Sequence, residues 1–226
     1  MGPAEPSGDH AGDSVPFRER LRRDRIAARL AMTDEEHWSA SAQITALLKS
    51  VLVARRPQAI GFCWPVRREF DARPLVSELI DGGWRACQPV VVTPAAPMQF
   101  RGWTPDAPMT TDRHGIPIPD TSRCTAPDVL LLPLVAFDGE GYRIGYGGGY
   151  FDRTLATLRP RPLTIGVGFE LGRIETTRPQ AHDIRLDMIV TEAGTWTFAS
   201  AVGVAGASCV TLTGHPPDHQ EPRRDT

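Results

Sequence analysis

The spacing of apolar residues changes between two periods along the chain, and the changes predict a series of helices and strands. Between residues 34 and 54, Ile44 and Leu48 recur at helical spacing, and Thr33 with Glu36 forms the pattern of a capping box in front of them. Short apolar runs of the kind found in strands alternate with such segments. Further helices are predicted at residues 17–32, 71–81 and 150–158, and strands at residues 59–64, 85–92, 98–103, 129–133, 163–169, 187–191 and 195–198.

This alternation predicts an α/β fold, a three-layer α/β/α arrangement with a mainly parallel sheet. The run Val129–Pro133 is apolar throughout, as expected for a strand covered on both faces. Ligands bind at the carboxyl ends of strands in such sheets. We therefore expect the loops after Trp64 and after Pro133 to form the binding site.

Two features refine the predicted helices. The helix at residues 17–32 carries a dense arginine face, and exposure to solvent is the simpler interpretation for Arg20, Arg23 and Arg25. Asp71 is expected to cap the helix that follows it.

Composition fits one catalytic domain. The chain has 226 residues, 41% of them hydrophobic, and a formal charge of −2, which gives no bias toward nucleic acid or membrane. No apolar run approaches the roughly 20 residues of a membrane span. We expect a cytoplasmic protein, because its four cysteines form no metal or disulfide pattern. We also expect a monomer or a small homo-oligomer.

The two ends of the chain differ from its centre. Residues 1–16 and 201–226 have little to bury and are predicted to be disordered, which leaves residues 17–200 as the catalytic domain. His215 and His219 have the spacing of metal ligands on a helix, but the prolines before His219 argue against one.

The segment Arg143–Arg153 is the strongest chemical signal. Gly145, Gly147, Gly148 and Gly149 fill four of five positions between a strand and a helix. Such a loop can bring backbone N–H groups onto a phosphate, although a surface turn is the simpler alternative. It is neither a Walker A motif nor a dinucleotide fingerprint.

The charged residues around the loop favour phosphate binding over a simple turn. Arg143 and Arg153 bound the glycines and can add bidentate charge to phosphate oxygens. Asp152 lies where it can hold a Mg²⁺ that bridges those oxygens.

With these residues, the segments 131–138 and 141–153 resemble the signature of 5-formyltetrahydrofolate cyclo-ligases, also called methenyltetrahydrofolate synthetases. The resemblance continues through residues 64–71, 115–117 and 182–192 and covers roughly residues 17–198. It implies a fold related to sugar-phosphate isomerases and CoA-transferases. It also implies an enzyme that uses ATP and Mg²⁺ to close 5-formyltetrahydrofolate to 5,10-methenyltetrahydrofolate, with ATP and a reduced folate as its partners.

The resemblance also assigns roles to residues of this chain. Arg143 and Arg153 are the expected catalytic residues, Asp152 and Asp187 the expected Mg²⁺ ligands. Expected ATP-binding residues are Arg18, Arg22, Arg143, Gly145, Tyr146, Gly147, Gly148, Gly149, Tyr150 and Phe151. Expected folate-binding residues are Trp64, Glu69, Tyr146, Gly147, Gly148, Gly149 and Tyr150.

Several of these residues have a structural alternative. Trp64 can be a core residue at a strand end, Glu69 an exposed loop acid, and Asp187 a loop cap before a strand. His182 and Asp183 invite a proton-relay interpretation, but a structural hydrogen bond is the better one for the histidine.

Four positions depart from the family pattern. Several relatives carry arginine and lysine where this chain has Tyr146 and Gly148, many have a glutamine near Gly172, and a small residue is common at Arg68. The departures leave two alternatives open, a paralogue acting on another heterocycle and a folate- or nucleotide-binding protein without turnover. The complete set of arginines, glycines and Asp152 in the loop argues against the second.

Overall fold

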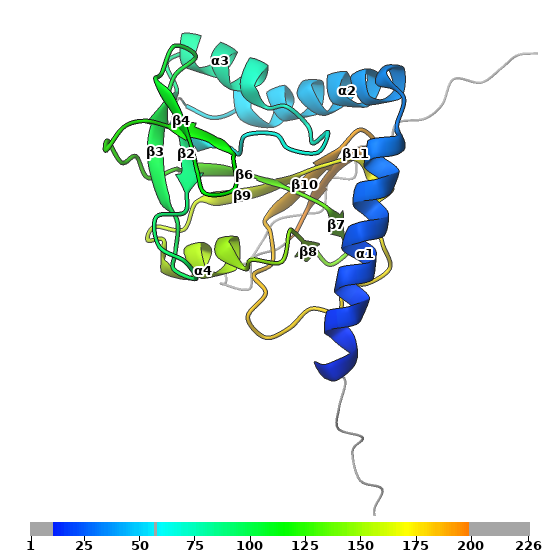
Figure 1. Ribbon diagram of the computed structural model, residues 1–226. Helices are drawn as coiled ribbons and strands as arrows, with labels where there is room; N and C mark the ends of the chain where they lie inside the picture. The colour runs from blue at the N-terminus through cyan, green and yellow to red at the C-terminus, as the bar shows by residue number, and fades with distance from the viewer. Residues whose placement is uncertain (1–10, 57, 199–226) are drawn as a thin grey trace, which may run out of the picture.

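The computed structural model describes residues 11–56 and 58–198, and its centre is a seven-stranded sheet (Figure 1). The strand order is β11-β10-β9-β6-β1-β2-β3. The inner strands β10, β9, β6, β1 and β2 run parallel, and β3 and β11 pair with them as antiparallel edges. The strands are β1 (Ala59–Gly61), β2 (Arg85–Val90), β3 (Gln99–Trp103), β6 (Val129–Pro133), β9 (Leu163–Val167), β10 (Met188–Thr191) and β11 (Gly194–Thr197).

Helices cover both faces of this sheet. α2 (Asp34–Val53) and α3 (Arg73–Asp81) lie on one face and α4 (Tyr150–Thr157) on the other (Figure 1). The predicted three-layer α/β fold is therefore confirmed. The first helix, α1 (Ala11–Ala31), belongs to neither layer and runs past the end of the sheet where β6 finishes (Figure 1).

Strand β6 is buried from both sides, as its continuous apolar sequence predicts. Val129 and Leu131 pack in the core shared with α2 and α3, whereas Leu130 and Leu132 pack in the core shared with α4. All four side chains are at most 3% exposed.

The predicted capping box at the start of α2 is confirmed. Thr33 Oγ1 accepts from Glu36 N at 3.1 Å, and Thr33 N donates to Glu36 Oε2 at 2.7 Å. The cap predicted for α3 is displaced by one residue, because the N-cap position belongs to Ala72. Asp71 instead accepts from Arg73 N at 3.0 Å and pairs with the Arg73 guanidinium.

Helix α1 differs from the prediction in its start and in its orientation. It begins at Ala11, so residues 11–16, expected to be disordered, are helical. Arg20 and Arg23 are exposed as expected, but Arg25 is half-buried and donates to Leu171 O at 3.0 Å. Part of the arginine face therefore points toward the protein, where its guanidinium groups donate to backbone carbonyls and not to water.

The predictions for the ends of the chain lie largely outside the described residues. This holds for the disorder expected at residues 1–10 and 201–226, and for the pair His215 and His219. Among the described residues, no helix is long and apolar enough to cross a bilayer.

Two short hairpins and a 3₁₀ helix escape the sequence pattern. β4 (Met109–Thr111) pairs with β5 (Pro117–Pro119), β7 (Ala136–Phe137) pairs with β8 (Arg143–Ile144), and η1 spans Glu170–Gly172. Elements of two or three residues are too short to show a period. The β7–β8 hairpin leads directly into the glycine loop.

Candidate active site

The glycine loop joins β8 to the first turn of α4 and has the backbone that only glycine adopts readily. Gly147 and Gly149 lie at φ 93° and 62°, in the left-handed region. Gly149 is the N-cap of α4, and no side chain caps the helix. The first N–H groups of α4 are therefore available to an anion.

Two arginines from different elements hold this loop. Arg22 of α1 donates from Nε to Gly145 O at 2.7 Å, and Arg153 of α4 donates to Gly148 O at 2.5 Å. The Arg153 guanidinium also stacks over the Tyr150 ring, 5.0 Å from its centroid. Of the four arginines predicted to contact phosphate, Arg22 and Arg153 thus bond the loop itself. Burial lowers the pKa of Arg22.

Arg143 lies beneath the loop, in an internal ion pair. It contacts Asp152 at 3.0 Å, and its side chain is only 6% exposed. Both partners are fixed to one peptide segment, since Arg143 donates to Ile184 O at 2.8 Å and Asp152 Oδ1 accepts from Ile184 N at 3.0 Å. This geometry gives Arg143 the role of orienting Asp152.

The two aspartates expected to bind Mg²⁺ have different environments. Asp152 Oδ1 is occupied, but no described residue donates to its Oδ2, so this carboxylate fits a metal held mainly by phosphate oxygens and water. Asp187 lies at the amino end of β10, where its Oδ2 accepts from Thr164 N and Oγ1 at 2.8 and 2.7 Å. Its Oδ1 pairs with Arg161 at 3.5 Å.

Asp187 therefore has the geometry of the loop cap that was its structural alternative. The described residues contain no group of three or more His, Cys, Asp or Glu side chains arranged around a metal.

Arg18 and Asp183 dock α1 onto the loop that precedes β10. Arg18 pairs with the Asp183 carboxylate at 2.5 Å and donates to the carbonyls of Thr177 and Arg178. Asp183 also accepts from Gln180 N at 2.7 Å. The His182 side chain is 71% exposed and lies 3.8 Å from Asp183. The surroundings of Asp183 thus suit docking better than proton transfer, whereas the His182 side chain lies largely in solvent.

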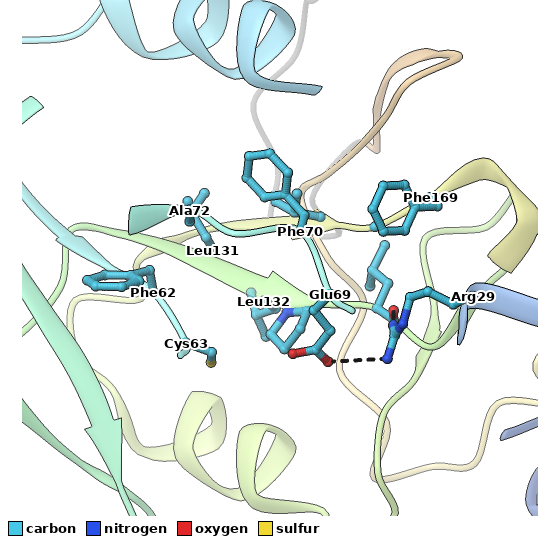
Figure 2. Close-up of a pocket in the computed structure, with 13 residues that line it drawn as sticks. Arg29, Phe62, Cys63, Glu69, Phe70, Ala72, Leu131, Leu132 and Phe169 are labelled. Carbon is cyan, nitrogen blue, oxygen red and sulfur yellow. Dashed lines mark hydrogen bonds and ion pairs between the residues drawn. The ribbon is translucent and has the colours of Figure 1, made fainter. Parts of the chain in front are cut away.

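Glu69 is buried, contrary to the loop-acid alternative, and lies among polar groups from three segments. Its Oε1 accepts from the Tyr146 hydroxyl at 2.7 Å, its Oε2 accepts from Val66 N at 3.0 Å, and Arg29 of α1 lies 3.8 Å away. Figure 2 shows the Glu69 and Arg29 side chains pointing toward each other. Burial raises the pKa of Glu69 above its usual range, against the opposing effect of the Tyr146 and Val66 hydrogen bonds.

The loop that carries Glu69 is strained and held from outside. Arg67 and Arg68 have φ of 48° and 57°, which is costly for residues with a side chain. Arg29 donates to Arg67 O at 2.9 Å. The Arg68 guanidinium donates to Asp34 and to the carbonyls of Met32 and Thr33, between α1 and α2. The arginine at position 68 therefore fixes the loop that carries Glu69 to the junction of α1 and α2.

A pocket opens beside Glu69 at the carboxyl ends of three parallel strands (Figure 2). The ends of β1, β6 and β9 and the residues that follow them supply an apolar wall. Cys63 adds a thiol to the pocket, and burial raises the pKa of this thiol. The pocket is lined by Arg29, Phe62, Cys63, Glu69, Phe70, Ala72, Leu131, Leu132, Pro133, Leu134, Val167, Gly168 and Phe169.

The aromatic residues expected near folate are divided between two places. Tyr146 reaches Glu69, whereas Tyr150 lies under Arg153 at the start of α4. Trp64 is half-buried, lies outside the pocket lining and stacks with Arg73 at 4.3 Å. Phe151 packs against the core on the α4 side.

Comparison with known proteins identifies the family. The model of the 5-formyltetrahydrofolate cyclo-ligase family matches residues 15–192. The chain belongs to this family. The cyclo-ligase of Escherichia coli K12 is 31% identical over 137 residues, covering 58% of this chain and 75% of that protein. The cyclo-ligase of Haemophilus influenzae is 25% identical over 185 residues, covering 76% and 97%.

Solved structures agree with the cyclo-ligase assignment. The NMR structure of Aquifex aeolicus 5,10-methenyltetrahydrofolate synthetase has a TM-score of 0.72 at 25% identity, covering 84% of this chain and 97% of that one. A Mycoplasma pneumoniae synthetase has a TM-score of 0.63 at 22% identity, covering 77% and 98%, and supports the fold alone.

Sequence reasoning missed Arg29, the most buried arginine of this cyclo-ligase site. Its side chain is 4% exposed and also donates to Leu134 O at 3.1 Å. The signal was present in the spacing of the arginines, because positions three and four apart share one helix face. Arg18, Arg22, Arg25 and Arg29 are spaced in this way, and all four bond backbone carbonyls.

Proposed function

We propose that this chain closes 5-formyltetrahydrofolate to 5,10-methenyltetrahydrofolate at the expense of ATP, releasing ADP and phosphate. The observation that carries the proposal is the hydrogen bond between Tyr146 of the glycine loop and Glu69 of the pocket, at 2.7 Å. An anion-binding loop and a buried carboxylate beside an apolar pocket thereby adjoin each other, as a reaction between a nucleotide and a heterocycle requires.

The chemistry needs positioned charge rather than a nucleophilic side chain. The formyl oxygen attacks the γ-phosphorus, the bond to ADP breaks, and the formyl carbon becomes an iminium phosphate. N10 then attacks that carbon, the C–O bond breaks as phosphate leaves, and N10 loses its proton. Phosphoryl transfer of this kind depends mainly on orientation and charge stabilisation.

The glycine loop is our proposed phosphate site. Its open N–H groups at the start of α4 suit phosphate oxygens, and Arg22 and Arg153 bring positive charge to the same loop. Arg18 and Arg143 are engaged with Asp183 and Asp152. We therefore assign Arg22 and Arg153 to the phosphates, and Arg18 and Arg143 to positioning.

Asp152 is our proposed protein ligand for Mg²⁺. Its Oδ1 is fixed by Arg143 and Ile184 N, which leaves Oδ2 for a metal. Bound there, Mg²⁺ would neutralise phosphate charge as ADP leaves. Asp187 is left out of this proposal, since Thr164 and Arg161 occupy its oxygens.

Glu69 is our proposed folate ligand. A carboxylate suits the paired donors of a pterin ring, and Glu69 borders the pocket at the carboxyl ends of the parallel strands. Trp64 is a weaker candidate, because its ring is covered by Arg73.

The test is the absorbance of purified protein mixed with 5-formyltetrahydrofolate, ATP and Mg²⁺. We expect the long-wavelength band of the methenyl product to grow, and to depend on ATP. ATP binding without that band would favour a paralogue acting on another heterocycle. If the protein binds ATP and the folate but consumes ATP with no related heterocycle, the result would favour a binding protein without turnover.

The departure at position 172 gives the paralogue little support. A Cβ on Gly172 would lie 3.0 Å from Val135 O, so this glycine is explained by close backbone packing.

A further inference from the structure

One hydroxyl group joins three segments that are far apart in the sequence. The Tyr146 hydroxyl donates to Glu69 Oε1 at 2.7 Å and accepts from Arg29 Nη2 at 2.8 Å. Tyr146 belongs to the glycine loop, Glu69 to the loop after β1, and Arg29 to α1. This hydroxyl therefore connects the glycine loop with the pocket loop and with α1 through one donated and one accepted hydrogen bond.

The two ends of this connection differ in rigidity. Glu69 is 6% exposed, and Val66 N and the bonds of Arg29 to Arg67 O and Leu134 O hold its surroundings. Tyr146 is 40% exposed and stands between two glycines, Gly145 and Gly147. The glycine loop can therefore change its backbone at little cost, whereas the carboxylate has a fixed location.

The charge state of Glu69 depends on the same connection. The charged and titratable groups that face Glu69 are Arg29 from α1, Tyr146 from the glycine loop, Arg67 from its own loop and Cys63 from the end of β1. Burial favours the protonated acid, while the hydrogen bond from Tyr146 favours the carboxylate. When Tyr146 is in place, Glu69 is better prepared to accept hydrogen bonds from a ligand.

We propose that the Tyr146 hydroxyl, held between Arg29 and Glu69, couples the glycine loop to the folate pocket, so that nucleotide and folate bind cooperatively. The proposal deepens the function proposed above and rests on it. A nucleotide whose phosphates fix the glycine loop also fixes Tyr146. The entropic cost of ordering the loop is then already met when folate binds. By linkage, folate must strengthen nucleotide binding by the same factor.

The test is a thermodynamic cycle on the full-length protein. The Kd of 5-formyltetrahydrofolate is measured by calorimetry with and without a non-hydrolysable ATP analogue and Mg²⁺, in the wild type and in Tyr146→Phe. Phe keeps the ring that Arg67 covers at 5.5 Å and removes only the hydroxyl. We expect the analogue to lower the Kd about tenfold in the wild type, and by less than about twofold in Tyr146→Phe.

Tyr142→Phe is the matched control. Tyr142 is half-buried just before the loop, and the structure records no hydrogen bond of its hydroxyl to any described residue. We expect this variant to keep the wild-type coupling. An unchanged coupling in Tyr146→Phe, or no coupling in the wild type, would overturn the proposal.

A second measurement needs no change at Tyr146. The chain has three tyrosines, so ultraviolet resonance Raman spectra of the wild type, assigned with Tyr142→Phe, report tyrosine hydrogen bonding. The analogue alone is expected to change the tyrosine doublet, and an unchanged doublet would contradict the link. Failure of the proposed function is distinguishable, because it appears as missing methenyl product in the wild type whatever the coupling.

Discussion

Arg22 of α1 donates from Nε to Gly145 O at 2.7 Å, and its guanidinium lies against the face of Gly147 that has no side chain. The first helix of the chain thus supplies a cation to a loop more than a hundred residues later. A hydrogen bond to a charged group contributes about 1.5–3 kcal/mol. Arg22→Ala is therefore expected to lower kcat/KM for ATP by about 10- to 100-fold, measured by the growth of the methenyl band.

The matched control for Arg22 is its neighbour Arg23. Arg23 is exposed and pairs only with Asp24, at 3.6 Å, so Arg23→Ala is expected to keep the wild-type kcat/KM. Equal losses in the two variants would mean that the helix contributes general positive charge and not a specific contact.

The ion pair between Arg143 and Asp152 connects the proposed metal binding with stability. Asp152→Ala leaves Arg143 buried without its partner, which costs about 3–5 kcal/mol in comparable pairs. Asp152→Asn keeps an acceptor for Arg143 and is expected to remain folded, to need more Mg²⁺ and to turn over at least about 100-fold more slowly. Thermal melting and a Mg²⁺ titration of activity separate the two effects. An Asp152→Asn enzyme with the wild-type Mg²⁺ requirement would exclude Asp152 as a metal ligand.

The parts of this structure that were predictable from sequence are those that depend on residues close together along the chain. The capping box of Thr33 and Glu36 is local, and strand β6 is buried from both sides because its sequence is apolar at every position. The carboxyl ends of β1 and β6 lie together, as expected, because parallel strands share one edge. The glycine loop was predictable because its backbone requires glycine.

The arrangement of charges was less predictable. Arginine on a helix surface usually faces water, and only the tertiary fold turns Arg25 and Arg29 toward buried carbonyls. Likewise, the partners of Asp187 are Thr164 and Arg161, which lie on another segment. A sequence pattern shows that a residue can carry charge but does not show which buried group will satisfy it.

Glu69 is expected to make the protein less stable as the pH rises. Burial raises the pKa of this carboxyl in the folded protein above its ordinary value of 4.5. The folded state therefore holds the proton more tightly, and the resulting stability is complete below that value and is lost as the pH rises through the folded-state pKa. Glu69→Gln cannot ionise, so its free energy of unfolding relative to the wild type is expected to increase between pH 4.5 and pH 8.

Urea denaturation at several pH values measures this trend. Glu175→Gln is the control for the substitution itself, because Glu175 is exposed. A difference between Glu69→Gln and the wild type that does not change with pH would show that Glu69 keeps its ordinary pKa in the folded protein. The same variant is expected to lose folate affinity, which a binding titration reports separately.

Asp183 is expected to show the opposite dependence. Although burial alone would raise its pKa, the hydrogen bonds from Arg18 and Gln180 N hold that pKa below the ordinary 3.8. The contribution of Asp183 to stability is therefore present above pH 3.8 and is lost as the pH falls through the folded-state pKa. Asp183→Asn is expected to have a lower free energy of unfolding than the wild type at pH 7. Near pH 3 the difference between the variant and the wild type is expected to be smaller.

The comparison variant is Asp24→Asn, whose exposed pair with Arg23 contributes at most about 1 kcal/mol. Asp183→Asn could instead lower the free energy of unfolding by the same amount at both pH values. That result would mean that shape and not charge docks α1 through Arg18, and that this docking is separate from the pH response of the protein.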